Sequence, residues 1–409
     1  MESLANTFNK SPSLFAHLDL NSCFASVEQQ ANPLLRFRPV AVTAYSADRG
    51  CILASSYEAK KMGVKTGMRF NEAKKLCSNL FSLVSDPPKY RFVHKQIKKL
   101  LEEYCPSVTA KSIDEYVLDF TDFNCQNTNL KKIFLEIKQE IKRQIGDYLT
   151  VSVGIAPSSY LAKVASNLKK PDGLEEINHE NYLKIYSKLN LTDLTGVNTK
   201  TATRLNMVGI YTVLDLYQAN IHQLNQAFHS ILASYWYQHL RGFDAGLWDT
   251  SRPKSIGHTY TLPKASQASA HTKAILAKLA EKIALRLRKK SFSAHGIYLA
   301  LRFQNGSSYN QHLSFARGVF DSSEIFKIAS KLFDQFPNLP ARNISLTCFK
   351  LTSISSLQLS LFEPVERKLD LNLGLDRIKS RFGDFSIFPA SMLGTSQHAP
   401  DAISFSNIP

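Results

Sequence analysis

Three carboxylates stand where they could bind metal ions. Asp19 lies near the end of LFAHLDL (14–20), and Asp114 and Glu115 are adjacent in KSIDEYVLDF (111–120). Burying adjacent acidic side chains is unfavourable unless cations hold them. If the two segments are neighbouring strands, the carboxylates converge and can hold two divalent ions about 3.5–4 Å apart, and Mg²⁺ prefers such oxygen ligands. The alternative is a pair of surface charges at a strand end.

The composition predicts a globular protein with a polyanionic partner. The 409 residues are 44% hydrophobic and have a formal net charge of +16, which favours nucleic acid first and an acidic membrane second. No apolar run reaches the roughly 18–20 residues of a membrane span, and the N-terminus has no secretory signal pattern. None of the six cysteines forms a C-x-x-C pair. We therefore expect free thiols in a reducing cytoplasm, with neither a zinc site nor a disulfide framework.

The elements that must position these carboxylates follow from hydrophobic periodicity. Strands are predicted at 14–20, 38–45, 50–57, 107–120 and 149–156, and helices at 90–104 and 129–145. This order favours an α+β sheet with helices on one face. Residues 180–240 read as all-helical, and 241–255 as a linker rich in Gly, Pro, Ser and Asp. A second α+β domain follows, with strands at 255–262, 294–304, 310–317 and 341–351 and helices at 267–290 and 322–336.

The positive charge is concentrated in the second α+β domain. Residues 254–351 contain 15 Lys plus Arg and 4 Asp plus Glu, a net charge of +11. One basic run, RLRKK (286–290), closes the predicted long helix and would alone be an ordinary solvated face. The concentration of charge predicts instead that this domain binds the DNA backbone, through Arg286, Arg288, Lys289 and Lys290.

Four motifs in order resemble the Y-family (translesion) DNA polymerases, most closely the bacterial DNA polymerase IV branch. They are HLDLNSCFASVEQ, ILASSYEAKKMGVKTGM, SIDEYVLDF and SVGIAPSSYLAKVASNLKKPDGL. The resemblance covers about residues 14–351. It implies an α+β multidomain, right-hand polymerase: a ferredoxin-like palm (13–22 and 87–178), small fingers (23–86), a helical thumb (179–240), a linker (241–253) and an α+β little finger (254–351). A C-terminal tail (352–409) follows.

The resemblance also implies roles for individual residues. Asp19, Asp114 and Glu115, with the backbone carbonyl of Leu20, fall on the ligands of two Mg²⁺ ions. Phe24 falls on the steric gate that disfavours a ribose 2′-OH, although a core phenylalanine is the alternative. The residues implied to bind the dNTP are Cys23, Phe24, Tyr57, Lys60 and Lys170. Asp114 is expected to bridge both ions, and Glu115 to serve the ion at the primer 3′-OH.

This sequence departs from the usual family pattern at four positions in these motifs. Lys60 stands where Arg is common, so the bidentate grip of a guanidinium on phosphate is lost. Ala54 replaces Thr or Ser, and Ser55 next to it would face the other way on a strand. Leu53 lies where the roof over the new base pair is often smaller. Asn21 replaces a second Asp that is not a metal ligand.

Two further segments predict contacts with DNA and with the replication machinery. LTDLTGVNTKTATRLNMVGIYTV (191–213) resembles a helix-hairpin-helix whose turn, with Gly196 and Asn198, would meet a DNA phosphate; an ordinary helix–loop–helix is the alternative. QLSLF (358–362) resembles the bacterial sliding-clamp-binding peptide, with Gln358, Leu359, Leu361 and Phe362 as contacts. Beyond it, a short amphipathic helix through Leu375, Ile378 and Phe382 has no assigned function.

Together these features predict a template-directed DNA polymerase for damage bypass in DNA repair or the SOS response. It is expected to be monomeric and cytoplasmic, with low fidelity because no segment is left for a proofreading exonuclease. Two alternatives stay open. A catalytically silent scaffold would bind DNA and clamp without extending a primer, and a nucleotidyl cyclase could share a palm-like fold.

Overall fold

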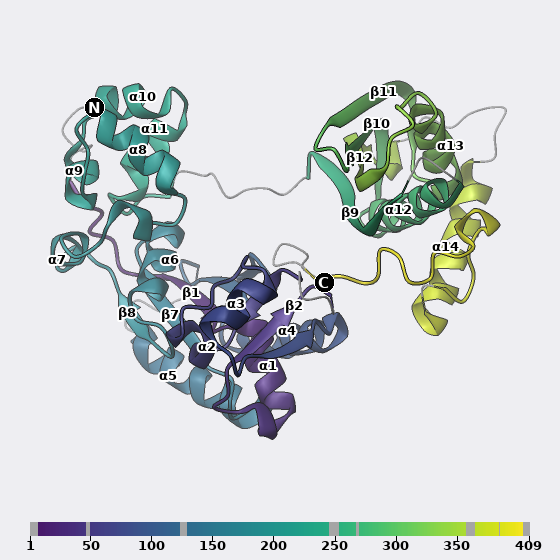
Figure 1. Cartoon of the computed structure of the whole chain (residues 1–409). Helices are drawn as coiled ribbons and strands as arrows, with labels where there is room; N and C mark the ends of the chain where they lie inside the picture. Colours follow the sequence, from purple (N-terminus) through teal and green to yellow (C-terminus); the bar gives the residue numbers. More distant parts are fainter. Residues whose placement is uncertain are drawn as a thin grey trace. The chain divides into compact units, whose positions relative to one another are not determined.

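The computed structural model describes residues 7–45, 50–122, 129–244, 253–266, 270–356, 365–383 and 385–403. The chain divides into two compact units, one of residues 1–249 with 402–409 and one of residues 250–401. Each unit is described by itself (Figure 1). The division falls within the predicted linker 241–253. The predicted clamp-binding peptide, 358–362, lies outside the described residues.

The larger sheet of the first unit has five strands in the order β5-β6-β1-β7-β8. The central strand β1 (Phe15–Leu20) is antiparallel to both β6 (Glu115–Asp119) and β7 (Val151–Ala156), while β5 (Val108–Ala110) and β8 (Leu174–Glu176) form the edges. The β1–β6 register pairs Asp19 directly with Glu115. Residues directly opposite in an antiparallel pair lie on the same face, so Asp19 and Glu115 share one face of the sheet.

Helices cover both faces of this sheet, so the expectation of helices on one face is wrong. The long helix α4 (Pro87–Tyr104) and α5 (Leu130–Glu140) share one apolar core with alternate β1 residues such as Leu18. On the opposite face, α6 (Ser159–Leu168) packs directly against Gly154. A Cβ atom at Gly154 would lie 2.0 Å from the carbonyl oxygen of Ala162. The close approach of α6 therefore requires glycine at this position.

A smaller sheet and three helices form the part of the first unit between β1 and α4. Its order is β3-β2-β4, with β2 (Val40–Thr43) antiparallel to β3 (Ile52–Ser55) and parallel to β4 (Phe81–Val84). The helices are α1 (Cys23–Ala31), α2 (Tyr57–Lys61) and α3 (Phe70–Leu76). Helix α2 begins at a Ser56 cap, whose side chain accepts a hydrogen bond from the Ala59 amide.

Residues 182–239 are helical, as the sequence predicts. The helices here are α7 (Tyr182–Tyr186), α8 (Thr199–Met207), α9 (Val213–Gln218), α10 (Ile221–Phe228) and α11 (Leu232–His239). They share an apolar cluster with α6 that includes Leu205, Leu216 and Trp236. This cluster joins the helical segment to the sheet that precedes it.

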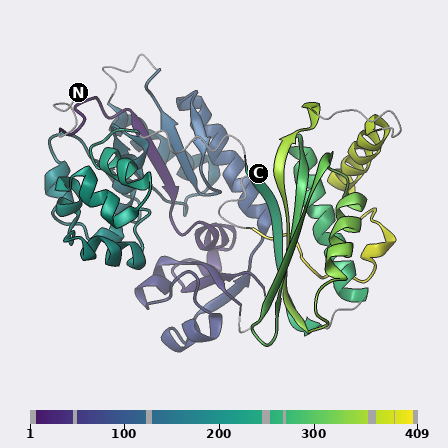
Figure 2. The ribbon, with the colours of Figure 1, turned by 90° about the horizontal axis from the view of Figure 1, so that it is seen from above.

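The second unit is a four-stranded antiparallel sheet, in the order β11-β10-β12-β9, with helices along one face (Figure 2). The strands are β9 (Ser255–Ser266), β10 (Phe292–Phe303), β11 (Ser308–Val319) and β12 (Ala341–Ser353). The helices α12 (Ala270–Lys289) and α13 (Ser322–Phe333) bury the inward residues of β10 and β12, such as Ile297 and Leu346. The opposite face carries polar residues at alternate positions, including Arg302, Asn343 and Thr259.

The predicted irregular tail is in part wrong, because the segment from 365 to 401 belongs to the second compact unit. It contains the helix α14 (Val365–Phe382), which is longer than the short helix predicted there. Polar contacts join α14 to α12 and α13, among them the ion pair of Lys368 with Glu324 at 2.8 Å. Among all described helices, none combines the length and the apolar character that crossing a membrane would need.

Candidate active site

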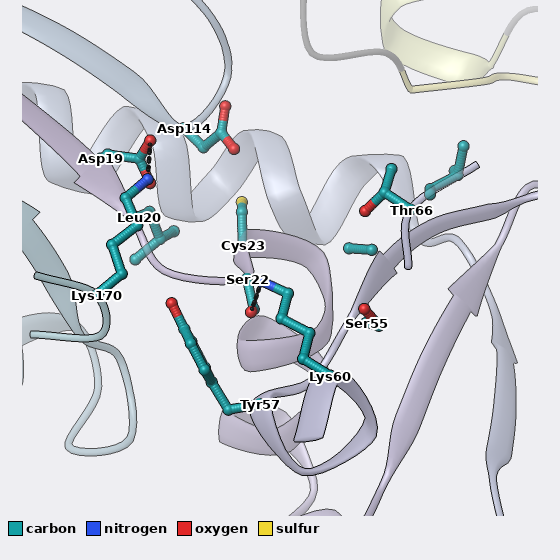
Figure 3. Close-up of a pocket in the computed structure, with 12 residues that line it drawn as sticks. Asp19, Leu20, Ser22, Cys23, Ser55, Tyr57, Lys60, Thr66, Asp114 and Lys170 are labelled. Carbon is teal, nitrogen blue, oxygen red and sulfur yellow. Dashed lines mark hydrogen bonds and ion pairs between the residues drawn. The ribbon is translucent and has the colours of Figure 1, made fainter. Parts of the chain in front are cut away.

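A pocket opens at the end of β1, where four segments distant in sequence meet. Its lining residues include both acidic and basic side chains (Figure 3). They are Asp19, Leu20, Ser22, Cys23, Leu53, Ala54, Ser55, Tyr57, Lys60, Thr66, Asp114 and Lys170. The pocket therefore brings together Asp19 and Asp114 with Tyr57, Lys60 and Lys170, as the sequence predicts.

The acidic side of the pocket is formed by Asp19 and Asp114, which lie beside each other in Figure 3. The Lys170 ammonium pairs with Asp19, with Nζ 2.8 Å from Oδ2. Within the described ranges, Asp114 makes no ion pair with a Lys, Arg or His side chain. Burial, with the charges of Asp19 and Glu115, raises its pKa to about 7, although a hydrogen bond from Ser112 opposes this. A further cation beside Asp114 would therefore be favourable.

The donors present fit a hard divalent cation. Asp19 and Asp114 offer carboxylate oxygens, and Leu20 also lines the pocket. Mg²⁺ binds through one or two carboxylates plus substrate phosphates, and these groups match that donor set. The raised pKa of Asp114 indicates the same need for positive charge.

Glu115 does not join the other two carboxylates in this structure. Its Oε2 lies 2.7 Å from Nζ of Lys163 on α6 and 3.6 Å from Nε2 of His17. Burial alone would raise its pKa, but His17 and Lys163 lower it to about 2. Across the described ranges, no group of three or more His, Cys, Asp and Glu side chains is arranged to hold a metal. The expected convergence of all three carboxylates is therefore absent here.

Asn21 fixes the loop that carries Lys170. Its buried side chain donates to Oγ of Ser152 at 2.9 Å and accepts from the amide of Asp172 at 2.8 Å. Ser152 lies on β7, opposite Asp19, and Asp172 lies on the loop after α6. The amide of Asn21 thus positions the loop of a pocket residue.

The basic side of the pocket lies on α2 and the turn before α1. Nζ of Lys60 donates to Oγ of Ser22 at 2.7 Å and lies 4.6 Å from the centre of the Tyr57 ring. Partial burial and the neighbouring Lys170 lower the pKa of Lys60, with Asp19 opposing. Burial and the charge of Asp19 raise the pKa of Tyr57 to about 12, so its phenol stays a hydrogen-bond donor at neutral pH.

The strand β3 forms a further wall of the pocket. Ser55 lines the pocket together with Ala54, so the expectation that it faces away is wrong. Its hydroxyl nevertheless donates to the carbonyl of Val64 at 3.3 Å. The hydroxyl that is missing at Ala54 is thus not simply replaced by Ser55. Leu53 also lines the pocket.

The gate position lies at the first turn of α1. Ser22 has φ of +50°, a left-handed conformation that turns the chain sharply from β1 into α1. Cys23 lines the pocket, whereas Phe24 is fully buried and stacks on Tyr90 with ring centres 4.5 Å apart. Burial, then the charges of Asp114 and Asp19, raise the pKa of Cys23. The Cys23 thiol is therefore not poised as a thiolate.

The predicted hairpin turn precedes α8. Gly196 has φ of +98°, which favours glycine, whereas Asn198 has an extended backbone and not a left-handed one. The side chain of Asn198 caps α8 by accepting from the Thr201 amide at 2.9 Å. Its role in the fold is therefore helix capping.

The predicted DNA-binding run on α12 does not form one surface. Arg288 is buried and makes an ion pair with Asp376, with Nε 2.7 Å from Oδ2. Arg286 contacts Nδ1 of His258 at 3.0 Å. Lys289 and Lys290 are exposed. The prediction that Arg288 contacts DNA is wrong, because its guanidinium is used inside the second unit.

Sequence reasoning missed several polar residues of the site. Ser22 binds Lys60, Thr66 lines the pocket, and Lys163 pairs with Glu115. Ser22 and Thr66 stand inside motifs that were recognised, but neither has a residue type that demands a function. Lys163 also stands inside a recognised motif, but only the packing of α6 on the sheet brings it to Glu115.

Two family models match most of the chain. The model of the impB/mucB/samB family matches residues 18–167, and that of the impB/mucB/samB family C-terminal domain matches residues 253–361. The first match includes Asp19, Asp114 and both lysines that contact Ser22 and Glu115.

Curated relatives with similarity over nearly the whole chain are bacterial proteins named DNA polymerase IV. The one from Pelotomaculum thermopropionicum is 31% identical over 382 residues, covering 92% of this chain and 94% of that protein. The one from Oceanobacillus iheyensis is 30% identical over 378 residues, covering 90% and 89%. The one from Bacteroides fragilis is 30% identical over 335 residues, covering 81% and 91%.

Two solved structures share the fold. A Y-family DNA polymerase chimera, Dbh-Dpo4(243-245)-Dbh, superposes with a TM-score of 0.71 at 24% identity, covering 83% of this chain and 99% of the chimera. A structure titled an insertion ternary complex of Dbh DNA polymerase gives a TM-score of 0.59 at 24% identity, covering 82% and 98%.

Proposed function

The chain belongs to the Y-family DNA polymerases, in the DNA polymerase IV branch, and on this basis we propose that it is a DNA-directed DNA polymerase for damage bypass. It adds dNTPs to a primer 3′-OH under the direction of a template. The observation that supports this most is the pocket, in which Asp19 and Asp114 face Tyr57, Lys60 and Lys170. This arrangement offers an acidic side for cations and a basic side for a triphosphate.

The metal ligands in this proposal are Asp19, Asp114, Glu115 and the backbone carbonyl of Leu20. When bound, two Mg²⁺ ions lower the pKa of the primer hydroxyl and offset negative charge on the leaving pyrophosphate. The chain's own contribution is to hold carboxylates and ammonium groups in fixed positions around the reacting phosphate. Asn21 contributes indirectly, because its hydrogen bond to Asp172 fixes the loop of Lys170.

The triphosphate binds against Tyr57, Lys60 and Lys170. Both ammonium groups suit phosphate oxygens as point charges, and the phenol of Tyr57 supplies a hydrogen-bond donor. In the absence of substrate, Lys60 donates a hydrogen bond to Ser22, and Lys170 pairs with Asp19. We propose that a triphosphate takes over those contacts.

Selection against ribonucleotides rests on the start of α1 in this proposal. Phe24 is fixed by its stacking on Tyr90, and a ring held rigidly excludes a 2′-OH better than a mobile one. Cys23, at the pocket wall, contacts the sugar or base of the dNTP. We also propose that the enzyme has low fidelity and does not proofread.

We assign the five-stranded sheet with its helices to the palm, the β3-β2-β4 part to the fingers, residues 179–240 to the thumb and the second unit to the little finger. DNA contacts in the thumb are the turn at Gly196 and the start of α8. In the little finger we favour Lys289 and Lys290, which are exposed, together with the polar face of the sheet. Arg286 is partly exposed and stays a candidate for DNA contact through its exposed atoms.

The remaining proposals concern partners. The peptide at 358–362 binds the bacterial sliding clamp through Gln358, Leu359, Leu361 and Phe362, and Phe362→Ala should abolish that binding in a pull-down with purified clamp. The protein acts as a monomer in the cytoplasm, during DNA repair or the SOS response. Clamp binding by the Phe362→Ala variant equal to that of the unchanged chain would contradict the assignment.

Primer extension tests the polymerase proposal. With Mg²⁺, dNTPs and a primer–template, the protein should extend the primer in a template-directed way, and Asp114→Ala should abolish extension. Asp119→Ala, at the far end of the strand β6 that follows Asp114 and outside the pocket, is the matched control. Full extension by Asp114→Ala would refute the site. No extension by the unchanged protein, with product from NTPs alone, would favour a cyclase.

A further inference from the structure

The backbone of Glu115 lies next to Asp19 and Asp114, but its side chain contacts other residues. The register places it directly opposite Asp19, on the same face of the sheet. Its carboxylate nevertheless binds Nζ of Lys163 at 2.7 Å, and it is not among the residues that line the pocket. Directly opposed residues have Cβ atoms about 4.5–5.5 Å apart. A change of side-chain rotamer would therefore suffice to bring Glu115 beside Asp19.

The position of Lys163 is set by the packing of α6. The helix begins at a Ser158 cap, and its backbone lies against Gly154 of β7. One turn further, Oγ of Ser166 donates to the Lys163 carbonyl at 2.8 Å and contacts Nδ1 of buried His17 at 3.2 Å. The packing of the helix places the Lys163 side chain where β1 ends and β6 begins, in contact with Glu115.

The pair is partly withdrawn from water. The side chains of Lys163 and Glu115 are 28% and 21% exposed. Nε2 of His17 lies 3.6 Å from the same Glu115 oxygen and has no hydrogen-bond partner within the described part of the chain. Two nitrogen atoms, Nζ of Lys163 and Nε2 of His17, thus converge on one carboxylate oxygen at the margin of the proposed metal site.

We propose that Lys163 is a positioning residue that holds Glu115 against α6 while no divalent ion is bound, and thereby lowers the affinity of the site for divalent ions. This inference rests on the proposed function, because it needs the metal site of Asp19 and Asp114. Lys163 touches neither substrate nor reacting atoms and acts only through Glu115.

Both effects of Lys163 on metal binding have the same sign. A carboxylate oxygen in contact with an ammonium group must give up that contact to bind a metal ion. The ammonium charge itself also repels a divalent cation nearby. Removal of Lys163 should therefore tighten metal binding, whereas the loss of a merely structural contact would weaken it or leave it unchanged.

The test measures Mn²⁺ binding to the full-length protein by electron paramagnetic resonance, without DNA or dNTP. Lys163→Met should bind Mn²⁺ about tenfold more tightly, which corresponds to ~1.4 kcal/mol. Lys163→Arg, which keeps the charge, should bind like the unchanged protein. Lys131→Met is the matched control, because it removes another lysine–carboxylate pair of the first unit, the 2.9 Å contact with Glu176.

The remaining outcomes separate the two proposals. One outcome is that Asp114→Asn abolishes Mn²⁺ binding while Lys163→Met binds Mn²⁺ as tightly as the unchanged protein or more weakly. That outcome overturns the role of Lys163 and leaves the proposed metal site intact. Binding that Asp114→Asn leaves unchanged overturns both. In a Glu115→Gln background the gain from Lys163→Met should shrink, because Lys163 then has no carboxylate to hold. An undiminished gain would assign the effect to charge alone and contradict the positioning role.

Discussion

Arg288 and Asp376 form a bidentate ion pair that joins α12 to α14. Nε and Nη2 of the guanidinium each lie 2.7 Å from a carboxylate oxygen, and the two side chains are 2% and 14% exposed. A third guanidinium nitrogen donates to the carbonyl of Phe320 at 3.1 Å. A buried arginine so fully satisfied is part of the architecture of the second unit.

The same face of α14 makes further polar contacts. Asn372 donates to Asp321, the residue that caps α13, at 3.0 Å, and Lys379 pairs with Glu281 of α12. The side chains of Leu371 and Phe382 are by contrast 63% and 67% exposed. The helix therefore docks through its polar face, with ion pairs in place of an apolar seam.

Loss of the Asp376 carboxylate should destabilise the second unit. Asp376→Ala leaves Arg288 buried without its counter-ion, and breaking a buried pair in this way costs about 3–5 kcal/mol. Hydrogen exchange of α12 and α14 amides in the full-length protein should show the loss of protection. Asp370→Ala, at an exposed position of the same helix, should change protection by less than about 0.5 kcal/mol. Equal protection in both variants would contradict the structural role of the pair.

The sequence predicted the helix through Leu375, Ile378 and Phe382 but not the direction of its faces. Apolar periodicity normally indicates the face that packs on a core. Here the contacts of α14 are made by charged residues such as Lys368 and Asp376. Their partners, Glu324 on α13 and Arg288 on α12, are known only from the tertiary structure. For the same reason the run RLRKK could not be divided from sequence into buried and exposed members.

A histidine at the helix–sheet boundary should make the second unit sensitive to acid. Burial, with the charges of Lys282 and Arg286, lowers the pKa of His258 to about 4. In the unfolded chain the value is about 6.5, so the unfolded state binds more protons between these values. Stability is therefore fully present above about pH 6.5 and is lost as the pH falls towards 4.

Calorimetry of the full-length protein can isolate this contribution. The glutamine in His258→Gln is polar but does not titrate. The free energy of unfolding of this variant should therefore fall by about 2–3 kcal/mol less than that of the unchanged protein between pH 7 and pH 4.5. The quantity compared is the difference between the two proteins at each pH, which removes the contribution of the other titrating groups. Parallel curves would show that His258 is accommodated in its charged form.

Those site residues that a single motif identifies could be predicted from the sequence. Asp19, Tyr57, Lys60 and Lys170 have chemically demanding side chains inside recognisable motifs, and the pocket contains them all. Glu115 could not be placed, because its partner Lys163 lies 48 residues later in the chain and reaches it only through the packing of α6 on Gly154. The two adjacent carboxylates differ in their contacts, because Asp114 lines the pocket whereas Glu115 contacts Lys163.

The predicted steric gate can be tested against a second buried phenylalanine. Phe24→Ala should raise the ratio of ribonucleotide to deoxynucleotide incorporation by tenfold or more, about 1.4 kcal/mol of lost discrimination. Phe134→Ala removes a fully buried ring of the same core, which packs on Phe120 and not on the pocket. It should lower stability and leave the ratio unchanged. A ratio that moves equally in both variants would assign the effect to loosened packing.

The lysine on α2 should act mainly on substrate binding. Lys60→Ala removes an ammonium group that now contacts Ser22 and the Tyr57 ring. A hydrogen bond to a charged group contributes about 1.5–3 kcal/mol, so the KM for dNTP should rise by about 10–100-fold, with a smaller fall in kcat. Lys60→Arg should keep or lower the KM, because a guanidinium binds phosphate with two parallel donors.

Lys61→Ala, the exposed neighbour on the same helix, should leave the KM within about twofold. Steady-state kinetics of single-nucleotide insertion measures all three, and a fall in kcat alone in Lys60→Ala would place this lysine in the chemical step instead.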